Sequence, residues 1–541
     1  MQGLMQDVPL TLVHFFERAE CLFPNKQIIT ATGTGRDRTT YGVWAARTRK
    51  VGGILDSLGV SPDGRVATFA WNTARHLELY FAAPCTGRVL HTLNIRLFPE
   101  QLTYIANHAE DEVVFVDKSL CALLFPLLKT FETVKHLIVM DDGKGEVPSD
   151  SAGIAVHDYE ELLAAADAVD FDVRDENRAA SMCYTSGTTG SPKGVVYSHR
   201  STYLHTVGSL VADGIGVREA DRILPVVPMF HANSWGLAHA AVASGADLVM
   251  PGPDLSPAGL VPLILEEDVT IAAGVPTIWL GCLPLLAGKP HRMRALLCGG
   301  SAVPKGLSEG YREQVGLPIL QAWGMTETSP VASICWTRSE LAGRPESELA
   351  DVRAKQGIAH IGVTLRVVEP DTSNELPWDG ESTGELQAKG NWIAKTYYND
   401  ERAAESFTAD GWLRTGDVAT IDPDGYVQLR DRTKDLIKSG GEWISSVDIE
   451  NELMAHPKIF EAAVIGVPHP RWDERPMACV VLKPGATMTG AEVIDHLRKT
   501  LAKWQLPDDV VFIDEVPKTS VGKFSKKTLR ERFADHKLPT A

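Results

Sequence analysis

The sequence predicts an α/β protein with a large amino-terminal domain of several subdomains and a small α+β carboxy-terminal domain. Its 541 residues are too many for one hydrophobic core. β-rich runs alternate with helical spacing along most of the chain, which is typical of layered α/β domains. The alternation fades near residues 362–369 and restarts after the charged stretch 430–434. We therefore place the domains at 1–432, with a β-rich subdomain at about 355–432, and at 433–541.

The expected elements of the large domain begin with an amphipathic helix at residues 10–22. Short β-rich runs then predict strands at 65–70, 113–117, 136–140, 179–184, 222–227, 247–250, 271–273, 295–298 and 319–322. In the β-rich subdomain we expect strands at 384–389 and 418–421, the second leading into the hairpin turn Asp422-Pro423-Asp424-Gly425. In the small domain we expect a helix at 447–454 and strands at 461–466, 477–482 and 509–513.

Composition excludes several classes of protein. The net charge of −17 argues against nucleic acid and anionic membrane as partners, so anionic substrates must be drawn by local basic groups. The eight cysteines are scattered without a C-x-x-C pair, which indicates a reducing compartment, here the cytoplasm, and no zinc site. We expect no signal peptide at residues 1–9. The most apolar stretch, 271–287, is interrupted by two prolines, so no integral membrane segment is expected.

A donor-rich loop follows the predicted strand at 179–184. It reads Thr185-Ser186-Gly187-Thr188-Thr189-Gly190-Ser191-Pro192-Lys193-Gly194. Glycines let the backbone approach an anion, while hydroxyl groups and a lysine add donors and charge. Because Lys193 is followed by glycine, the loop does not fit the Walker pattern. It predicts a phosphate loop of another kind; the alternative is an ordinary surface connection.

This loop resembles the phosphate loop of the adenylate-forming superfamily, which includes acyl-CoA synthetases, luciferases and peptide-synthetase adenylation domains. The family's later motifs occur in order as far as Lys523, so the resemblance covers nearly the whole chain. It implies ATP, Mg²⁺ and CoA as ligands and a mobile carboxy-terminal domain. It also implies nucleotide contacts by Thr185, Ser186, Gly187, Thr188, Thr189, Gly190 and Lys193.

A second motif, Gly324-Met325-Thr326-Glu327-Thr328, follows a predicted strand. A carboxylate beside hydroxyl groups suits Mg²⁺, which prefers oxygen ligands and keeps several waters. The resemblance implies that Thr326 contacts phosphate and that Glu327 holds the metal together with Thr185; the alternative is a helix N-cap. The resemblance also assigns adenine binding to the stretches Gly299-Gly300-Ser301-Ala302 and Gln321-Ala322-Trp323, and it adds Gly324 to the nucleotide contacts.

Three charged positions near the predicted domain boundary complete the nucleotide site. Asp417 is suited to accept hydrogen bonds from two ribose hydroxyls, although a turn aspartate is the alternative. Arg432 resembles the family's second ribose and phosphate contact, and Lys434 matches its hinge position. A hinge residue need only absorb a backbone change and stay solvated.

The acid substrate is expected beside His231 and Trp235. The family places a histidine or aromatic residue against the reacting carboxylate, and Trp235 resembles an aromatic gate of its acyl tunnels; packed core residues are the alternative. Val303 and Pro304 are expected to line the same pocket. No acid lies between His231 and Trp235 to pair a substrate ammonium, so amino acids are poor candidates and an apolar carboxylic acid fits better.

The small domain carries two further predicted sites. The loop Lys438-Ser439-Gly440-Gly441-Glu442-Trp443 resembles the family's CoA-binding loop, with Lys438, Gly440, Gly441, Glu442 and Trp443 as contacts. Lys523 on the loop 517–524 resembles the catalytic lysine of the adenylation step, with Glu327 and His231 as the other catalytic candidates. A disordered basic tail is the alternative for Lys523.

These resemblances imply an ATP-dependent acid–CoA ligase that works through an acyl-adenylate. The loop after Lys438 resembles medium- and long-chain acyl-CoA synthetases and 3-methylmercaptopropionate–CoA ligases, so medium-chain fatty or methylthio-alkanoic acids such as 3-(methylthio)propionate are expected. Alternatives are transfer to a carrier protein, a long-chain substrate, oxidation as in luciferases, or a nucleotide-binding regulatory module. A homodimer is also considered.

Overall fold

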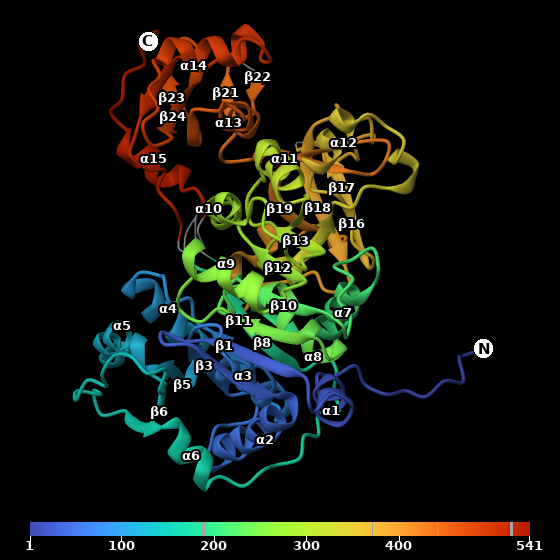
Figure 1. Cartoon of the computed structure of the whole chain (residues 1–541), viewed down its shortest axis with the longest axis vertical. Helices are drawn as coiled ribbons and strands as arrows, with labels where there is room; N and C mark the ends of the chain where they lie inside the picture. Colours follow the sequence, from blue (N-terminus) through green and yellow to red (C-terminus); the bar gives the residue numbers. More distant parts are fainter. Residues whose placement is uncertain (186–190, 371, 441, 520–522) are drawn as a thin grey trace.

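The computed structural model describes residues 1–185, 191–370, 372–440, 442–519 and 523–541 (Figure 1). The predicted contacts Ser186, Gly187, Thr188, Thr189, Gly190 and Gly441 therefore lie outside the described residues. Among the described residues the strands form four sheets, of seven, nine, four and five strands. No helix in this part of the chain combines the length and the apolar character that a bilayer crossing requires.

The first sheet carries the start of the phosphate loop at its edge. Its order is β7-β6-β5-β3-β4-β8-β9, and only the last pair is antiparallel. The strands are β3 (Arg65–Phe69), β4 (Val89–Thr92), β5 (Asp111–Asp117), β6 (His136–Met140), β7 (Ala155–Asp158), β8 (Ala179–Tyr184) and β9 (Gly194–Ser198). Because β8 and β9 are paired, Thr185 and Lys193 face each other at the mouth of the loop: the Thr185 N–H donates to the Lys193 carbonyl at 3.0 Å.

The second sheet supplies the opposite wall of the site. Its order is β16-β15-β14-β13-β12-β10-β11-β1-β2, with a parallel centre. The strands are β1 (Gln27–Ala31), β2 (Arg36–Thr40), β10 (Arg222–Pro225), β11 (Asp247–Met250), β12 (Ile271–Gly274), β13 (Ala295–Cys298), β14 (Ile319–Gly324), β15 (Val331–Ile334) and β16 (Ile358–Ala359). The carboxyl ends of β13 and β14 lie side by side, so the segments 299–302 and 324–328 begin at one edge.

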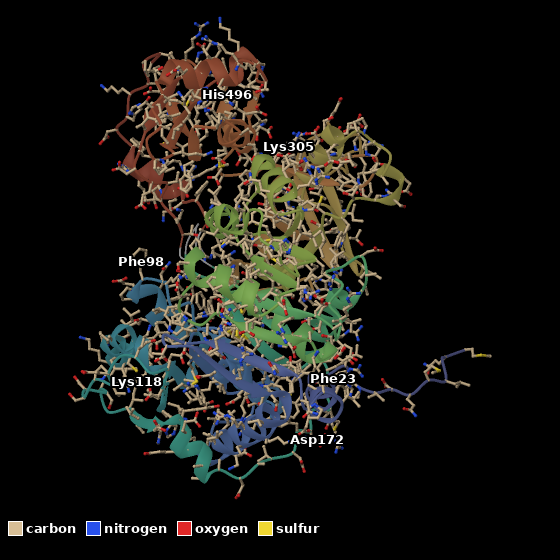
Figure 2. All side chains as sticks on the ribbon, in the orientation of Figure 1. Phe23, Phe98, Lys118, Asp172, Lys305 and His496 are labelled. Atoms are coloured by element: carbon tan, nitrogen blue, oxygen red, sulfur yellow. The ribbon has the colours of Figure 1, made fainter. Side chains whose placement is uncertain are left out.

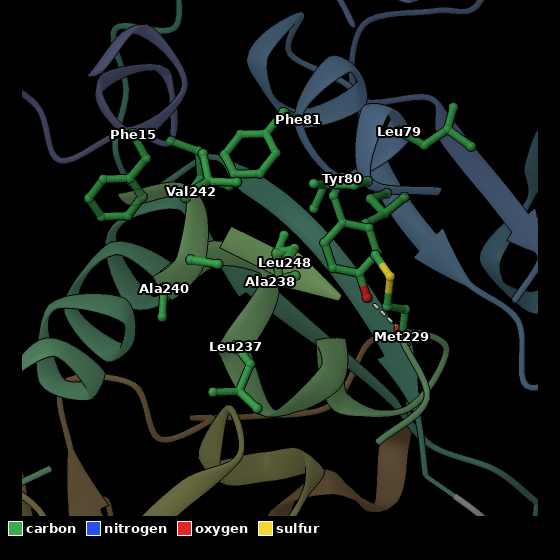
Figure 3. Close-up of a cluster of buried hydrophobic side chains, with 14 of the residues drawn as sticks. Phe15, Leu79, Tyr80, Phe81, Met229, Leu237, Ala238, Ala240, Val242 and Leu248 are labelled. Carbon is green, nitrogen blue, oxygen red and sulfur yellow. Dashed lines mark hydrogen bonds between the residues drawn. The ribbon is translucent and has the colours of Figure 1, made fainter. Parts of the chain in front are cut away.

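Helices and a large apolar core join the first two sheets. The helices concerned are α1 (Val13–Leu22), α2 (Tyr41–Ser57), α3 (Ala74–Cys85) and α8 (Leu237–Ser244). Figure 3 shows Phe15 of α1, Phe81 of α3 and Val242 of α8 together in this core. The hydroxyl of Tyr80 donates to the carbonyl of Met229, which fixes the segment that leads to His231. The core therefore holds the segment 229–231, beside which the acid substrate is expected, against α3.

Eight further α-helices occur among the described residues of the large domain. They are α4 (Pro99–Ala109), α5 (Cys121–Leu124), α6 (Tyr159–Ala165), α7 (His199–Leu210), α9 (Pro257–Glu266), α10 (Pro276–Leu286), α11 (Lys305–Gln314) and α12 (Glu346–Arg353). In Figure 2, Lys305 marks the start of α11, which lines a cavity facing the small lobe, and His496 marks the small lobe itself.

The predicted β-rich subdomain contains a four-stranded antiparallel sheet. Its strands are β17 (Val363–Val368), β18 (Gly384–Gly390), β19 (Leu413–Ile421) and β20 (Val427–Arg432), in that order. The predicted hairpin turn joins β19 to β20, and Gly425 has a φ of 86°, which a side chain would strain. β19 begins earlier than expected, so Asp417 lies within a strand rather than in a turn.

The last sheet belongs to a small carboxy-terminal lobe, at the top in Figure 1. Its strands are β21 (Ile437–Ser439), β22 (Glu442–Ile444), β23 (Ile459–His469), β24 (Asp473–Leu482) and β25 (Asp509–Phe512), with helices α13 (Ser446–Met454), α14 (Gly490–Leu497) and α15 (Lys526–Arg532). Separate apolar clusters cover its two faces. The predicted α+β fold of this lobe is confirmed, and β23 and β24 are longer than expected because they form a hairpin across their whole length. The division at residue 432 stays a prediction.

Candidate active site

Two adjoining cavities gather most of the residues that the sequence singled out. The loop-side cavity has a volume of about 540 Å³ and is lined by Thr185, Lys193, His231, Trp235, Gly300, Ala322, Trp323, Gly324, Thr326, Glu327, Arg432, Lys434 and Lys523 among others. The lobe-side cavity has a volume of about 490 Å³, lies between α10 and α11 on one side and α13 and α15 on the other, and is lined by Gly300, Ser301, Ala302, Pro304, Gln321, Asp417 and Lys523 among others. Both cavities share Lys523, so the small lobe closes the site.

Lys523 reaches from the small lobe into the large domain. Its Cε lies 3.2 Å from the place where a Cβ on Gly300 would be. Gly300 also has a φ of 84°, so glycine suits the backbone there, and a Cβ at this position would contact the lysine side chain tightly. Burial, assisted by nearby Arg432, lowers the pKa of Lys523 to about 8, against the opposing influence of Asp417 and Glu327. The predicted catalytic lysine thus lies in the cavity that Glu327 lines.

The lowered pKa of Lys523 predicts an alkaline limit on its chemistry. A lysine is charged below its pKa, so the ammonium is present below about pH 8 and is lost above it. If Lys523 stabilises developing phosphate charge, kcat/KM for ATP in pyrophosphate release should fall as pH rises through this range. Lys523→Arg should keep its charge, and its alkaline limb should move upward. An unchanged limb in Lys523→Arg would contradict the assignment.

Glu327 and Lys193 both contact Tyr397, a residue that the sequence motifs do not indicate. The Tyr397 hydroxyl donates to Glu327 Oε1 at 2.6 Å, and Lys193 Nζ lies 4.4 Å from the centre of the Tyr397 ring. Lys193 Nζ also donates to Ser406 Oγ at 3.3 Å. Burial raises the pKa of Glu327, and the hydrogen bond from Tyr397 opposes that rise. In the sequence the pair Tyr397-Tyr398 is typical of two core tyrosines. Only the fold shows that Tyr397 contacts the charged groups of the site.

Asp417 is held by residues from two other parts of the chain. The Trp323 indole N–H donates to Asp417 Oδ2 at 2.9 Å, and the Arg432 guanidinium lies 3.4 Å from Asp417 Oδ1. The carboxylate is 6% exposed, at the edge of the lobe-side cavity. The structure therefore brings together the predicted ribose-binding pair and the predicted adenine-side tryptophan.

The segment 232–235 has an unusual backbone. Ala232, Asn233, Ser234 and Trp235 all have φ between 44° and 54°. Such a left-handed turn of non-glycine residues is strained and must be held by its surroundings. The Asn233 amide donates to Ser181 Oγ at 2.8 Å, and Ser234 Oγ donates to the Val227 carbonyl at 2.8 Å. The turn points Trp235 at Gly299, where an added Cβ would lie 3.3 Å from its ring.

His231 precedes this turn and lines the loop-side cavity with Lys523. Burial, with a smaller contribution from Lys523, lowers the pKa of His231 to about 3. The imidazole is therefore neutral at physiological pH. It can orient a carboxylate by a hydrogen bond, but it does not supply a charge.

Several predicted residues lie elsewhere. Val303 is 3% exposed in the core against α10 and α11, and Pro304 lines the lobe-side cavity rather than the pocket beside His231. The Gln321 side chain is committed to the backbone of Val303 and of residues 353–355. In the predicted CoA loop, Lys438, Gly440 and Trp443 line neither cavity, and Trp443 is 54% exposed. The backbone of Glu442 is in β22, beside them.

Two lobes that close on a cavity with a phosphate-loop lysine, a buried glutamate and a second-lobe lysine define an adenylate-forming fold. The AMP-binding enzyme family matches residues 16–398, and the AMP-binding enzyme C-terminal domain matches residues 448–523. The chain therefore belongs to the AMP-binding enzyme family, as the phosphate loop predicts.

Known relatives place the chain among acid–CoA ligases. It is 44% identical over 541 residues to 3-methylmercaptopropionyl-CoA ligase of Ruegeria lacuscaerulensis, covering 99% of both chains. It is 47% identical over 539 residues to long-chain-fatty-acid–CoA ligase of Thermus thermophilus, covering 98% of this chain and 97% of the relative. ATP-bound MatB of Rhodopseudomonas palustris is similar in structure, with a TM-score of 0.81 at 28% identity over 97% of this chain and 99% of that one. The predicted class, an AMP-forming acid–thiol ligase, is confirmed.

Proposed function

We propose that this protein converts a carboxylic acid, ATP and CoA into an acyl-CoA, AMP and pyrophosphate through an acyl-adenylate. The observation that carries the proposal is the entry of Lys523 into the cavity that Lys193, Glu327 and Arg432 line. In the first step a carboxylate oxygen bonds to the α-phosphorus of ATP, and pyrophosphate leaves with the electrons of the broken P–O bond. In the second step the CoA sulfur bonds to the acyl carbon, AMP leaves, and the thiol proton is released.

The first step builds charge on phosphate oxygens, so positioned cations supply most of the catalysis. In this proposal Lys193 binds the polyphosphate, Lys523 contacts the α-phosphate and the carboxylate, and neutral His231 orients the acid. Ser301, Ala302 and Trp323 form the walls for the adenine. The small lobe, which places Lys523 in the cavity, is proposed to limit the access of water.

The residues near Glu327 fit Mg²⁺. No group of three or more histidine, cysteine or acidic side chains that could hold a metal occurs among the described residues. Mg²⁺ does not require such a cage, because it is usually held by one or two carboxylates together with substrate phosphates and waters. Glu327, 6% exposed beside Thr326, offers the carboxylate, and Thr185 offers a hydroxyl across the cavity. Bound there, the ion would neutralise charge on the leaving pyrophosphate.

Asp417→Asn tests the nucleotide part of the proposal. Asp417 is proposed to accept hydrogen bonds from both ribose hydroxyls, and hydrogen bonds to charged groups contribute about 1.5–3 kcal/mol. AMP affinity, measured by calorimetry, should therefore fall at least about tenfold. Asp410→Asn is the control because the exposed Asp410 side chain accepts a hydrogen bond from Thr408 at 2.6 Å, lies 3.6 Å from Arg366 and lines neither cavity. Equal affinities in both variants would exclude the ribose assignment.

The second step requires the predicted CoA loop, which lies away from both cavities. We propose that the small lobe turns about Lys434 after adenylation and brings Lys438, Gly440, Gly441, Glu442 and Trp443 to the acyl carbon. Lys434 is exposed at the start of the lobe, as a solvated hinge requires.

The proposed acids are medium-chain fatty or methylthio-alkanoic acids such as 3-(methylthio)propionate. One named relative is a 3-methylmercaptopropionyl-CoA ligase and the other a fatty-acid–CoA ligase, which supports methylthio and fatty acids as classes, and the segment from His231 to Trp235 offers no carboxylate for a substrate ammonium. A panel of fatty, methylthio and amino acids, scored by AMP release with CoA, tests this proposal. Replacing CoA with a carrier protein tests the alternative acceptor. All eight cysteines are free, which accords with the proposed cytoplasmic location. The formation of a homodimer stays a prediction.

A further inference from the structure

The segment 394–398 crosses the phosphate end of the loop-side cavity as a strap. At one end the Ala394 N–H donates to the main-chain carbonyl of Glu327 at 2.8 Å. At the other end the Tyr398 N–H donates to the carbonyl of Gly194 at 2.9 Å. Five residues therefore join the backbone beside the metal-binding candidate to the backbone next to Lys193.

Tyr397 lies in the middle of this strap and points into the site. Its side chain is 7% exposed and packs with Cys183, Val195 and Ala403, and its ring lies 5.6 Å from that of Phe407. From this fixed place the hydroxyl donates to Glu327 Oε1 at 2.6 Å and the ring face supports Lys193 Nζ at 4.4 Å. One rigid aromatic side chain thus contacts both charged groups.

The two charges need such a separator. Lys193 acts electrostatically on Glu327, so the two groups are close enough to attract each other. A direct ion pair between them would occupy the ammonium that must bind phosphate and the carboxylate that must bind the metal. Tyr397 gives each group a different partner: a hydroxyl for the carboxylate and a π face for the ammonium.

We propose that Tyr397 is a positioning residue that holds Lys193 and Glu327 apart at the spacing required by a metal–polyphosphate group. This inference rests on the proposed function. Tyr397 acts on the β- and γ-phosphates and their Mg²⁺ only through Lys193 and Glu327. It does not act on the AMP portion of the nucleotide, which Asp417 and Trp323 face from the other side of the site.

The test compares Tyr397→Phe with Tyr398→Phe. Tyr397→Phe keeps the ring beneath Lys193 and removes the hydroxyl that holds Glu327. The control changes the adjacent tyrosine, whose ring contacts His108 instead. Calorimetry would measure the affinity for Mg²⁺ with inorganic pyrophosphate, and separately the affinity for AMP. For Tyr397→Phe we expect affinity for magnesium pyrophosphate to fall roughly tenfold and AMP affinity to stay at the wild-type value. Tyr398→Phe should change neither.

The possible outcomes separate a failure of the Tyr397 inference from a failure of the proposed function. If wild-type protein binds AMP and magnesium pyrophosphate but Tyr397→Phe binds both equally well, this inference alone is overturned. If wild-type protein binds neither, the proposed function fails and the inference fails with it. A double variant supplies a second measurement: in a Glu327→Ala background, Tyr397→Phe should add little further loss of magnesium pyrophosphate affinity. A full additional loss would mean that Tyr397 does not act through Glu327.

Discussion

Replacing Lys523 with alanine should reduce adenylate formation about a hundred- to a thousandfold while leaving thioester formation from supplied acyl-AMP largely intact. The expected loss of adenylation rate follows from the effect of removing one preorganised charge-stabilising donor, which raises the barrier by about 2.7–4 kcal/mol. The intact thioester formation is expected because the proposed mechanism assigns that step to the loop at 438–443 of the small lobe and not to Lys523. Pyrophosphate release and conversion of acyl-AMP to acyl-CoA measure the two steps separately.

The control for this experiment is Lys499→Ala, an exposed lysine of the same lobe that lines neither cavity. It should leave both steps unchanged. Lys523→Arg should retain part of the adenylation rate because it keeps the charge with a different shape. If Lys523→Ala slows both steps to the same extent, Lys523 supports the lobe as a whole and is not specific to adenylation.

The sequence predicts the strands of this fold well because each core strand is a short apolar run between turn residues. β8 and β13 begin and end at the predicted residues. The sequence predicts that β19 starts at Val418, but the strand starts at Leu413, because residues 414–417 face the two cavities and lack an apolar pattern. A strand whose residues are polar because they line a site is therefore difficult to predict from its apolar pattern.

The site residues divide in a similar way. Lys193, Glu327, Asp417 and Lys523 stand in motifs whose residue types suit their chemistry, and the fold brings them to adjoining cavities. Tyr397 has no such motif, because a tyrosine beside another tyrosine is typical of a core. The left-handed turn at 232–235 also has no sequence signal, since none of its four residues is glycine.

The orientation of the lobe is the part that no local pattern could predict. It depends on contacts between segments far apart in the chain. The Ser446 N–H at the start of α13 donates to Asp431 Oδ2 at 2.8 Å, and the Ser446 hydroxyl also donates to this carboxylate. Lys526 donates to the Ser446 hydroxyl and pairs with Glu450 at 2.9 Å. Since Lys526 is three residues after Lys523, these contacts fix the direction in which the catalytic candidate points.

Asp431→Asn should therefore release the lobe from the orientation that places Lys523 in the cavity. Asp431 is 4% exposed and accepts charge-assisted hydrogen bonds at the amino end of α13, where a negative charge is favoured. Losing about 1.5–3 kcal/mol of this interaction should slow adenylation roughly ten- to a hundredfold. The rate of thioester formation from acyl-AMP should stay the same or rise, because the proposed mechanism assigns that step to the other orientation of the lobe.

Asp495→Asn is the matched control, since the Asp495 side chain is 66% exposed on α14 and forms an ion pair with nearby Arg498 at 2.6 Å. Equal slowing of both half-reactions by Asp431→Asn would show that these contacts stabilise the whole protein rather than one orientation.

Lys526→Met examines the same contacts from the small lobe and adds a dependence on pH. It should produce the same split between the half-reactions, and it should also leave Glu450 buried without its cation, which is destabilising.

Burial already raises the pKa of Glu450 to about 7 with Lys526 present, and loss of the lysine should raise it further. Below that pKa the carboxyl is neutral and its burial is tolerated; above it the charged form is unpaired. Thermal unfolding should therefore show Lys526→Met losing most stability, relative to the wild type, at alkaline pH. A stability difference that does not vary with pH would exclude Glu450 as the group left unpaired.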